Sequence, residues 1–183
     1  MFDFKAQKAR GDLYRNIRAF FTGKGYLEVF TPTLSPYLIP EPTIKTFSTL
    51  FSNEFTGERE MYMIPSPEIF MKEMLASGSP SIFQISSCFR NAEQLGDVHN
   101  PEFSMLEYYT LDYDEKDSIA LTEEMIKATA ISEPQWLKNK SLIITMEEAM
   151  WEYAKVDLLK AQEYPYLREE AERLSLYVPD EEA

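Results

Sequence analysis

Two segments with alternating side chains, at residues 81–89 and 103–112, constrain the fold more than any other feature of the chain. In "SIFQISSCF" and "FSMLEYYTLD" side chains of different character alternate along the chain. This two-residue period is typical of a β-strand. We expect the two segments to pair as a hairpin. The twelve residues between them, 91–102, are long for a hairpin loop, and loops of that length often bind ligands. Gly96 is the expected flexible point of this loop.

The alternation divides each predicted strand into two faces. Phe83, Ile85 and Phe89 form the face of the first strand that we expect to contact the core. The opposite face of that strand carries Gln84, Ser86, Cys88 and Arg90. On the second strand one face carries Phe103, Met105, Glu107, Tyr109 and Leu111. A guanidinium group therefore ends one strand, beside a strand face with a carboxylate and aromatic rings.

Helical periodicity and capping residues predict the elements around these strands. Helices are expected at residues 13–23, 66–78, 116–130 and 166–174, and Thr145 with Glu148 has the spacing of a capping box. The second helix has Ser66 as its N-cap and is expected to bury Phe70, Met74 and Met71. The third is expected to carry Ile119, Met125 and Ile126.

Shorter β-segments complete the expected architecture. "YLEVFTPTL" predicts a short strand that ends near Pro32, and the prolines of "SPYLIPEP" predict an irregular connection. Strands are also expected at 43–51 and 60–66. Because strands and helices mix without regular βαβ alternation, the sequence predicts an α+β fold with an antiparallel sheet flanked by helices.

Composition narrows the classes of function. The chain has 18 Lys and Arg against 31 Asp and Glu, a net charge of −13, which disfavours binding a nucleic-acid backbone but does not exclude local contact with RNA. One cysteine and one histidine among 183 residues exclude a structural zinc site or an iron–sulfur cluster, so no metal ligands are predicted. No apolar run approaches the ~20 residues that span a bilayer, and no signal peptide is evident, so a cytoplasmic protein is expected.

The residues alone leave two interpretations of the hairpin open. In the first, Arg90 binds a carboxylate or phosphate, Glu107 binds an ammonium group and Phe103 stacks on a purine, which together suit a zwitterionic ligand. In the second, Arg90 and Glu107 simply pair across the strands and Phe103 is a core side chain. Neither interpretation is favoured by the pattern itself.

Three motifs give the chain a family resemblance. "FRNAEQLGDVHNPEFSMLEYY" resembles motif 2 of class II aminoacyl-tRNA synthetases, and its "HNPEF" and "MLE" are similar to the lysyl enzymes. "GYLEVFTPTLSP" resembles motif 1, and "SPEIFMKEMLASGSPSIFQISSCFR" resembles the segment that joins the two motifs. The resemblance covers roughly residues 4 to 130. With no anticodon-binding barrel before motif 1, the chain is similar to the stand-alone lysyl-tRNA synthetase paralogue that modifies elongation factor P.

The resemblance implies a ligase that uses ATP, with Mg²⁺, to activate lysine or a related amino acid. The product would be transferred to a lysine of elongation factor P or to tRNA. Because half of an antiparallel sheet leaves an unpaired edge and exposed apolar surface, we expect a homodimer formed through motif 1, or else disorder at the end of the chain. By position in the motifs, the implied amino-acid ligands are Arg90, Glu68, Glu107 and Tyr109. The implied ATP ligands are Arg90, His99, Asn100 and Phe103. Arg90 would contact both the carboxylate and the α-phosphate, and is therefore the implied catalytic residue.

Glu68, His99 and the neighbouring Cys88 can each be explained without a ligand. Glu68 also suits a helix N-terminus, where an acid is favourable without any ligand. His99 in a loop is also accounted for as a solvated side chain, and Cys88 as a packing residue.

The sequence departs from the family pattern in three ways. Ala92 stands where the motif 2 glutamate is expected and Glu93 follows one position later, in a loop one residue longer; "GDVH" also lacks the arginine expected before the histidine. No glycine follows Gly96, so the glycine-rich motif 3 is missing. We therefore expect residues 1–140 to be the first half of a catalytic domain and 141–183 a helical insertion or truncated end. A catalytically inactive amino-acid-binding or dimerisation module is the alternative.

Overall fold

The computed structural model describes residues 3–92, 94–96 and 98–176. The chain divides into two compact units, Met1–Leu137 and Lys138–Ala183. The first unit contains every predicted site residue that the structure describes. Glu93, the displaced acid of the loop, lies outside the described residues.

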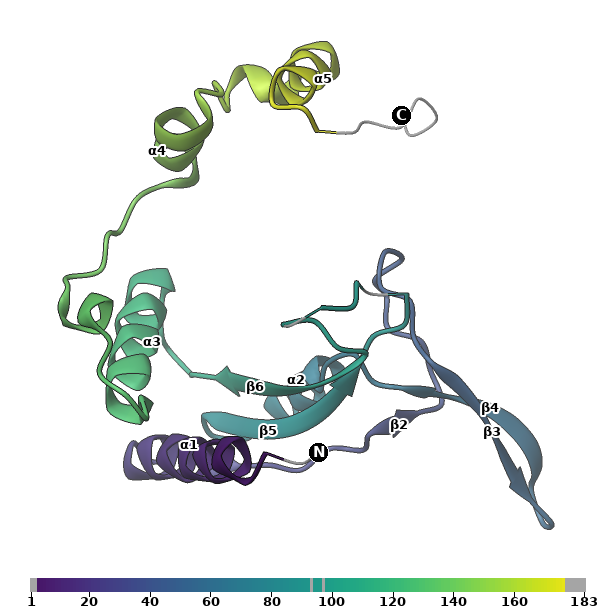
Figure 1. Ribbon diagram of the computed structural model, residues 1–183. Helices are drawn as coiled ribbons and strands as arrows, with labels where there is room; N and C mark the ends of the chain where they lie inside the picture. Colours follow the sequence, from purple (N-terminus) through teal and green to yellow (C-terminus); the bar gives the residue numbers. More distant parts are fainter. Residues whose placement is uncertain (1–2, 93, 97, 177–183) are drawn as a thin grey trace. The chain divides into compact units, whose positions relative to one another are not determined.

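A three-stranded sheet organises the first unit (Figure 1). Strands β5 (Ile82–Phe89) and β6 (Glu102–Tyr109) pair antiparallel along their whole length, so the predicted hairpin is confirmed. Strand β1 (Leu27–Glu28) is short, as expected, but it runs parallel to β5. The sheet is therefore mixed, whereas the sequence predicted an antiparallel one. Between β1 and β5 the chain passes through β2, β3, β4 and α2, and it then returns to run beside β1 in the same direction.

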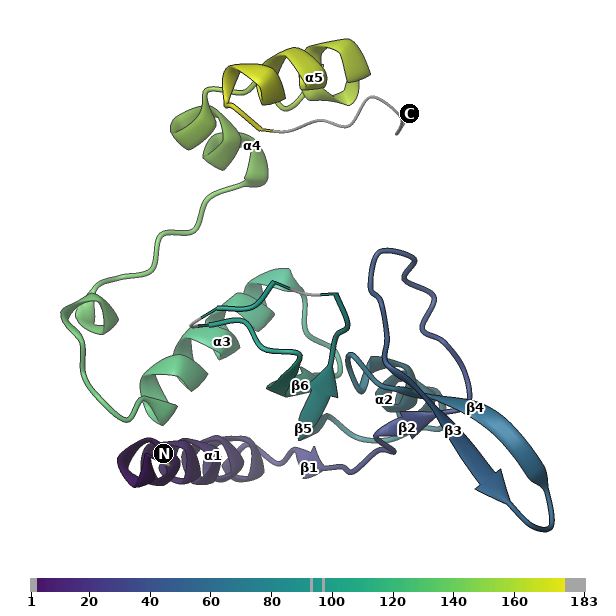
Figure 2. The same ribbon diagram turned by 45° about the vertical axis from the view of Figure 1, so that its right-hand side comes forward.

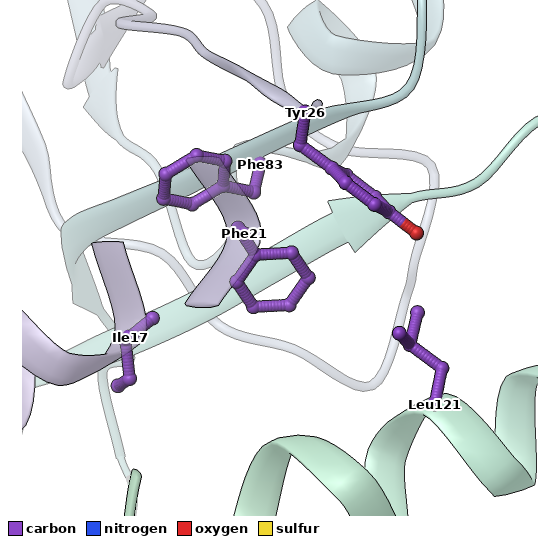
Figure 3. Close-up of a cluster of buried hydrophobic side chains, with 5 residues drawn as sticks. All are labelled: Ile17, Phe21, Tyr26, Phe83 and Leu121. Atoms are coloured by element: carbon purple, nitrogen blue, oxygen red, sulfur yellow. The ribbon is translucent and has the colours of Figure 1, made fainter. Parts of the chain in front are cut away.

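Helices α1 (Phe4–Gly23) and α3 (Glu115–Thr129) cover one face of β5 and β6 with apolar side chains. Five buried residues from α1, its C-terminal turn, β5 and α3 point toward one another, as Figure 3 shows: Ile17, Phe21, Tyr26, Phe83 and Leu121. The rings of Phe21 and Phe83 stack at 5.0 Å between centroids, and Phe21 also contacts Tyr108 of β6 at 4.9 Å. This aromatic cluster fixes α1 against the sheet.

Local chemistry sets the ends of these helices. The Asp3 side chain accepts hydrogen bonds from two backbone N–H groups in the first turn of α1, and Gly25, with φ +83°, lets the chain turn after its last residue. Asp114 forms a capping box at the start of α3. In α3 Leu121 and Thr129 are buried, while Ile119 and Ile126 are each 41% exposed, because α1 lies against the other side of the helix.

Helix α2 (Glu68–Ala76) packs near the opposite face of the sheet through a second apolar cluster. Met71 is completely buried there, with Val29 and Ile82, whereas Phe70 and Met74 are half-buried. The prediction that the helix buries Met71 is thus confirmed, but Phe70 also lines an open groove. The prediction of Ser66 as the N-cap is wrong by one residue, because α2 begins at Glu68 and Pro67 is its N-cap. The Ser66 hydroxyl nevertheless accepts a hydrogen bond from the backbone N–H of Glu68.

A second sheet contains β2 (Leu34–Ser35), β4 (Gly57–Met63) and β3 (Ser48–Asn53), all antiparallel. Strands β3 and β4 form a hairpin that projects from the rest of the unit (Figure 2). Gly57, with φ +79°, makes the turn possible, and Asn53 accepts two backbone hydrogen bonds within it. Most side chains of this hairpin are exposed.

The second unit is helical. Its elements are α4 (Met146–Ala149), the π-helical turn η2 (Met150–Ala154), the 3₁₀ turn η3 (Lys160–Gln162) and α5 (Tyr164–Arg173); η1 (Gln135–Lys138) falls at the division between the units. Thr145 and Glu148 form the predicted capping box. Within the described part of the chain, no helix has both the length and the apolar character to cross a membrane.

The aromatic cluster generates a stability prediction. Replacing the fully buried Phe21 in Phe21→Ala is expected to lower the free energy of unfolding by about 3 to 5 kcal/mol, because it removes a ring from a closely packed cluster. Phe4→Ala on the same helix, where the side chain is 80% exposed, should change it by less than about 0.5 kcal/mol. Urea denaturation followed by circular dichroism measures both. Equal losses in the two variants would contradict the proposed core.

Candidate functional site

One face of the β5–β6 hairpin carries three of the predicted site residues, Phe103, Glu107 and Tyr109. Glu107 lies opposite Gln84, Phe103 opposite Cys88, and Tyr109 opposite Ile82. Residues directly opposite each other on paired strands share a face, so the predicted face assignment is confirmed. Since a strand advances about 3.3 Å per residue, Phe103 and Glu107 lie about 13 Å apart along β6.

The end of this face nearest the loop is a pocket with a cation over an aromatic ring. Six residues line the pocket, which has a volume of about 330 Å³: Arg90, Val98, His99, Asn100, Phe103 and Ser104. The guanidinium carbon of Arg90 lies 5.3 Å from the ring centroid of Phe103. The backbone N–H of Arg90 donates to the carbonyl of Pro101 at 3.0 Å, which closes the base of the loop. All four predicted nucleotide ligands are thus brought together.

The Arg90 side chain has an unused donor. Its Nε is buried and donates no hydrogen bond to any residue that the structure describes. A buried donor without an acceptor is costly, and native proteins rarely keep one unless water or a ligand supplies the acceptor. The pocket is therefore suited to a ligand that brings an oxygen atom to Arg90.

The other end of the face is built around Glu107. Its Oε1 accepts a hydrogen bond from the Tyr109 hydroxyl at 2.8 Å, and its Oε2 accepts one from the Ser66 hydroxyl at 2.7 Å. Burial raises the pKa of the Tyr109 hydroxyl, and the Glu107 carboxylate raises this pKa further. Tyr109 therefore remains a hydrogen-bond donor, and the carboxylate is held in one orientation.

Ser66 connects Glu107 to the start of α2. Its hydroxyl accepts a hydrogen bond from the Glu68 backbone N–H at 3.0 Å while donating to Glu107. The Glu68 side chain is the first carboxylate of α2 and pairs with Lys72, one turn later. Ser66, which the sequence indicated only as a helix cap, therefore joins Glu107 to the backbone at the start of α2, where Glu68 lies.

The alternative in which Arg90 simply pairs with Glu107 does not fit these contacts. Glu107 lies opposite Gln84 and uses its oxygens for Ser66 and Tyr109. Arg90 lies over Phe103, which is half-buried and belongs to neither apolar cluster. The two charged groups thus lie at separate ends of one strand face.

The loop that follows Arg90 departs from the family pattern in sequence, and it begins in an unusual backbone conformation. Ala92, at the position where a glutamate was expected, has φ +58°, a left-handed conformation that is unfavourable for a residue with a Cβ. Asn91 supports it by accepting a hydrogen bond from the Ala92 N–H, and its own N–H donates to the carbonyl of Lys45. The start of the loop is thereby attached to the connection before β3.

The described residues do not form a metal site. Among residues 3–92, 94–96 and 98–176, no group of three or more His, Cys, Asp and Glu side chains is arranged to hold an ion. No residue of this chain is therefore assigned to Mg²⁺. Cys88 is buried and lies opposite Phe103 on the neighbouring strand, and burial raises the pKa of its thiol, so it is a packing residue with little thiolate character.

Comparison with known families gives a match over nearly the whole chain. The model of the class II tRNA synthetases (D, K and N) matches residues 4–180. The resemblance of the motifs ends near residue 130, but the match to the family model continues beyond it into the second unit.

Three similar curated relatives are each named elongation factor P–(R)-β-lysine ligase. The relative from Histophilus somni (strain 2336) is 41% identical over 127 residues, which are 69% of this chain and 39% of the relative. The relative from Hamiltonella defensa is 34% identical over 168 residues, which are 91% of this chain and 49% of the relative. The relative from Haemophilus influenzae (strain KW20) is 48% identical over 109 residues, or 58% and 33% of the two chains. The chain therefore matches less than half the length of each of these relatives.

The Tyr109 hydroxyl generates a prediction about pH. In the folded chain its pKa is raised, so above about pH 10 the unfolded chain loses this proton first and the free energy of unfolding falls. In Tyr109→Phe this contribution is absent, although the lost hydrogen bond costs about 1 to 2 kcal/mol at neutral pH. Denaturation curves between about pH 8 and 11 should therefore converge as pH rises. Parallel curves would contradict the assigned environment of Tyr109.

Proposed function

Since this chain belongs to the family of class II tRNA synthetases (D, K and N), we propose that its β5–β6 face binds a lysine-like amino acid and ATP. The observation that carries the proposal is the separation of charge along that face. A cation with an unused donor lies over an aromatic ring at one end, and a positioned carboxylate lies about 13 Å away. The adenylate of a lysine-like amino acid has its adenine base at one end and its side-chain ammonium group at the other, which matches this separation.

In the proposed complex, the pocket at Arg90 receives the nucleotide. Phe103 stacks on the adenine, since base stacking on an aromatic ring requires only an exposed face of the ring. Arg90 binds the α-phosphate and the amino-acid carboxylate, both of which present oxygen atoms in the fork geometry that a guanidinium recognises. His99 and Asn100 lie along the triphosphate.

At the other end, the three remaining residues bind the amino acid. The Glu107 carboxylate binds the side-chain ammonium of the amino acid. The Tyr109 and Ser66 hydroxyls hold the Glu107 carboxylate in place. Glu68 binds the α-ammonium, because its backbone is bonded to Ser66 and its carboxylate is near enough to Tyr109 to raise the pKa of that hydroxyl. Lysine has two ammonium groups and one carboxylate, and the proposed site offers the two acids Glu107 and Glu68 and the guanidinium group of Arg90.

The proposed reaction is adenylate formation in the whole protein. A carboxylate oxygen of the amino acid attacks the α-phosphorus of ATP, the bond to the β-phosphate oxygen breaks, and pyrophosphate leaves. Negative charge accumulates around the α-phosphorus in this step, and Arg90 stabilises it. Mg²⁺ would assist by neutralising the triphosphate, but the residues described here offer no site for it.

The proposed acceptor of the activated amino acid is a lysine of elongation factor P. Two considerations support this choice over tRNA: the curated relatives carry the name of elongation factor P–(R)-β-lysine ligase, and the net charge of −13 repels a nucleic-acid backbone. Such a reaction belongs to the cytoplasm. Lysine and (R)-β-lysine are both proposed as candidate amino acids.

A calorimetric titration of ATP into the chain tests the nucleotide pocket. Phe103→Leu is expected to weaken ATP binding about tenfold or more, because stacking on a base is lost. Arg90→Lys should weaken it as well, since an ammonium group cannot replace the bidentate fork.

Strand β3 offers a matched control for these two variants. Arg59 lies 5.5 Å from the ring centroid of Phe51, the same arrangement away from the pocket. Phe51→Leu and Arg59→Lys should therefore leave ATP binding unchanged. ATP binding that is insensitive to Phe103, or equally sensitive to Phe51, would overturn the assignment.

Lysine-dependent exchange of pyrophosphate into ATP tests the catalytic part of the proposal. We expect exchange from a product of this gene that includes a glycine-rich third motif, and none from these 183 residues, in which no glycine follows Gly96. Lysine binding without exchange by any product of the gene would instead favour an inactive amino-acid-binding module.

An apolar groove supports the proposed homodimer. Leu27, Val29, Pro32 and Met74 line it together with the end of α2, and Phe30 nearby is 77% exposed. Exposed apolar surface of this kind on the first motif suits contact with a second copy. Phe30→Asp is expected to convert a dimer into a monomer in sedimentation velocity, whereas Phe55→Asp on the projecting hairpin, 93% exposed, should not. A wild-type monomer would contradict the proposal.

A further inference from the structure

Lys72 has an unexpected position within the proposed amino-acid site. Helix α2 places it one turn after Glu68, and its ammonium group forms an ion pair with the Glu68 carboxylate. Both side chains remain accessible, at 39% exposed for Glu68 and 59% for Lys72. The carboxylate proposed to bind the α-ammonium of a ligand is thus already paired with an ammonium group of the chain itself.

Other acids surround this ammonium group. The Glu68 hydrogen bond and charge raise the pKa of Lys72, and the charges of Glu107 and Glu41 raise it further. Glu41 belongs to the irregular connection between β2 and β3. That connection lies against the start of α2, since its Tyr37 and Thr46 line the same small cavity as Ser66.

We propose that Lys72 acts as an internal counter-ion that competes with the α-ammonium of the amino acid for Glu68. In the free chain Lys72 neutralises the carboxylate, and a ligand must either displace it or bind beside it. The inference rests on the function proposed above for Glu68. It makes Lys72 a residue that sets affinity and selects ligands whose ammonium group can replace its own.

The competition is expected to be moderate. An exposed ion pair between side chains one helical turn apart contributes little stability, so a ligand can displace Lys72. If the ligand instead uses the second oxygen of Glu68, Lys72 remains a few ångström from a like charge, and electrostatic repulsion opposes binding. In both cases the Lys72 charge weakens ligand binding, so its removal should strengthen binding about three- to tenfold.

A supporting role for Lys72 predicts the opposite sign. If the ion pair served to hold Glu68 in its binding orientation, loss of Lys72 would release the carboxylate and weaken binding. The direction of the change in affinity therefore separates competition from support.

The test is calorimetric titration of L-lysine into the 183-residue chain and into Lys72→Met, which keeps the length of the side chain but removes its charge. The expected result is about three- to tenfold tighter binding to Lys72→Met and near wild-type binding to Lys72→Arg, which restores the ion pair. Unchanged or weaker binding to Lys72→Met overturns the inference.

Two controls make the result specific. Nα-acetyl-L-lysine lacks the α-ammonium group, so its affinity should not increase in Lys72→Met; an equal increase for both ligands would overturn the competition at Glu68. Lys127→Met removes a matched ion pair, to Glu123 on α3, and should leave lysine binding unchanged. A similar gain in Lys127→Met would indicate a general charge effect and overturn the inference.

The outcomes also separate this inference from the proposed function. If neither the wild-type chain nor Lys72→Met binds L-lysine or (R)-β-lysine, the proposed amino-acid site fails. If the wild-type chain binds lysine, Glu68→Gln abolishes that binding and Lys72→Met does not improve it, the site stands and only the role of Lys72 fails.

Discussion

The register between β5 and β6 is the constraint on which the rest of the structure depends. Because side chains alternate, a slip of one residue in either strand would move its site residues into the core and its core residues into solvent. The aromatic contact between Phe21 and Phe83 opposes such a slip, since it fixes one face of β5 against α1. The position of Glu107 opposite Gln84 thus depends on packing behind the sheet. Stability and ligand geometry share this dependence.

Features with a local cause were predictable from the sequence. The two-residue period gave the faces of both strands of the hairpin, and Thr145 with Glu148 gave a helix start, because alternation and capping depend on residues close in the chain. The pocket residues Arg90 and Phe103 were also predictable as neighbours, since one ends the first strand and the other begins the second.

Features that depend on distant contacts were not predictable in the same way. The parallel pairing of β1 joins Leu27 to Ile82, which are far apart in the sequence, and nothing within the two residues of β1 indicates its direction. The bond from Ser66 to Glu107 joins residues 41 positions apart and has no signature in either segment. The role proposed for Lys72 is hidden for another reason, because its spacing from Glu68 is that of any helical ion pair.

Opposite charges lie at the two ends of the β5–β6 face: Arg90, over Phe103, is at one end, and Glu107, next to the start of α2 with Glu68, is at the other. A crystal structure of the chain with a non-hydrolysable lysyl-adenylate analogue tests this most directly. The predicted result is an adenine ring against Phe103, the phosphate mimic at Arg90 and the side-chain ammonium at Glu107. An analogue that binds elsewhere, binds in the reverse direction or does not bind would contradict the account.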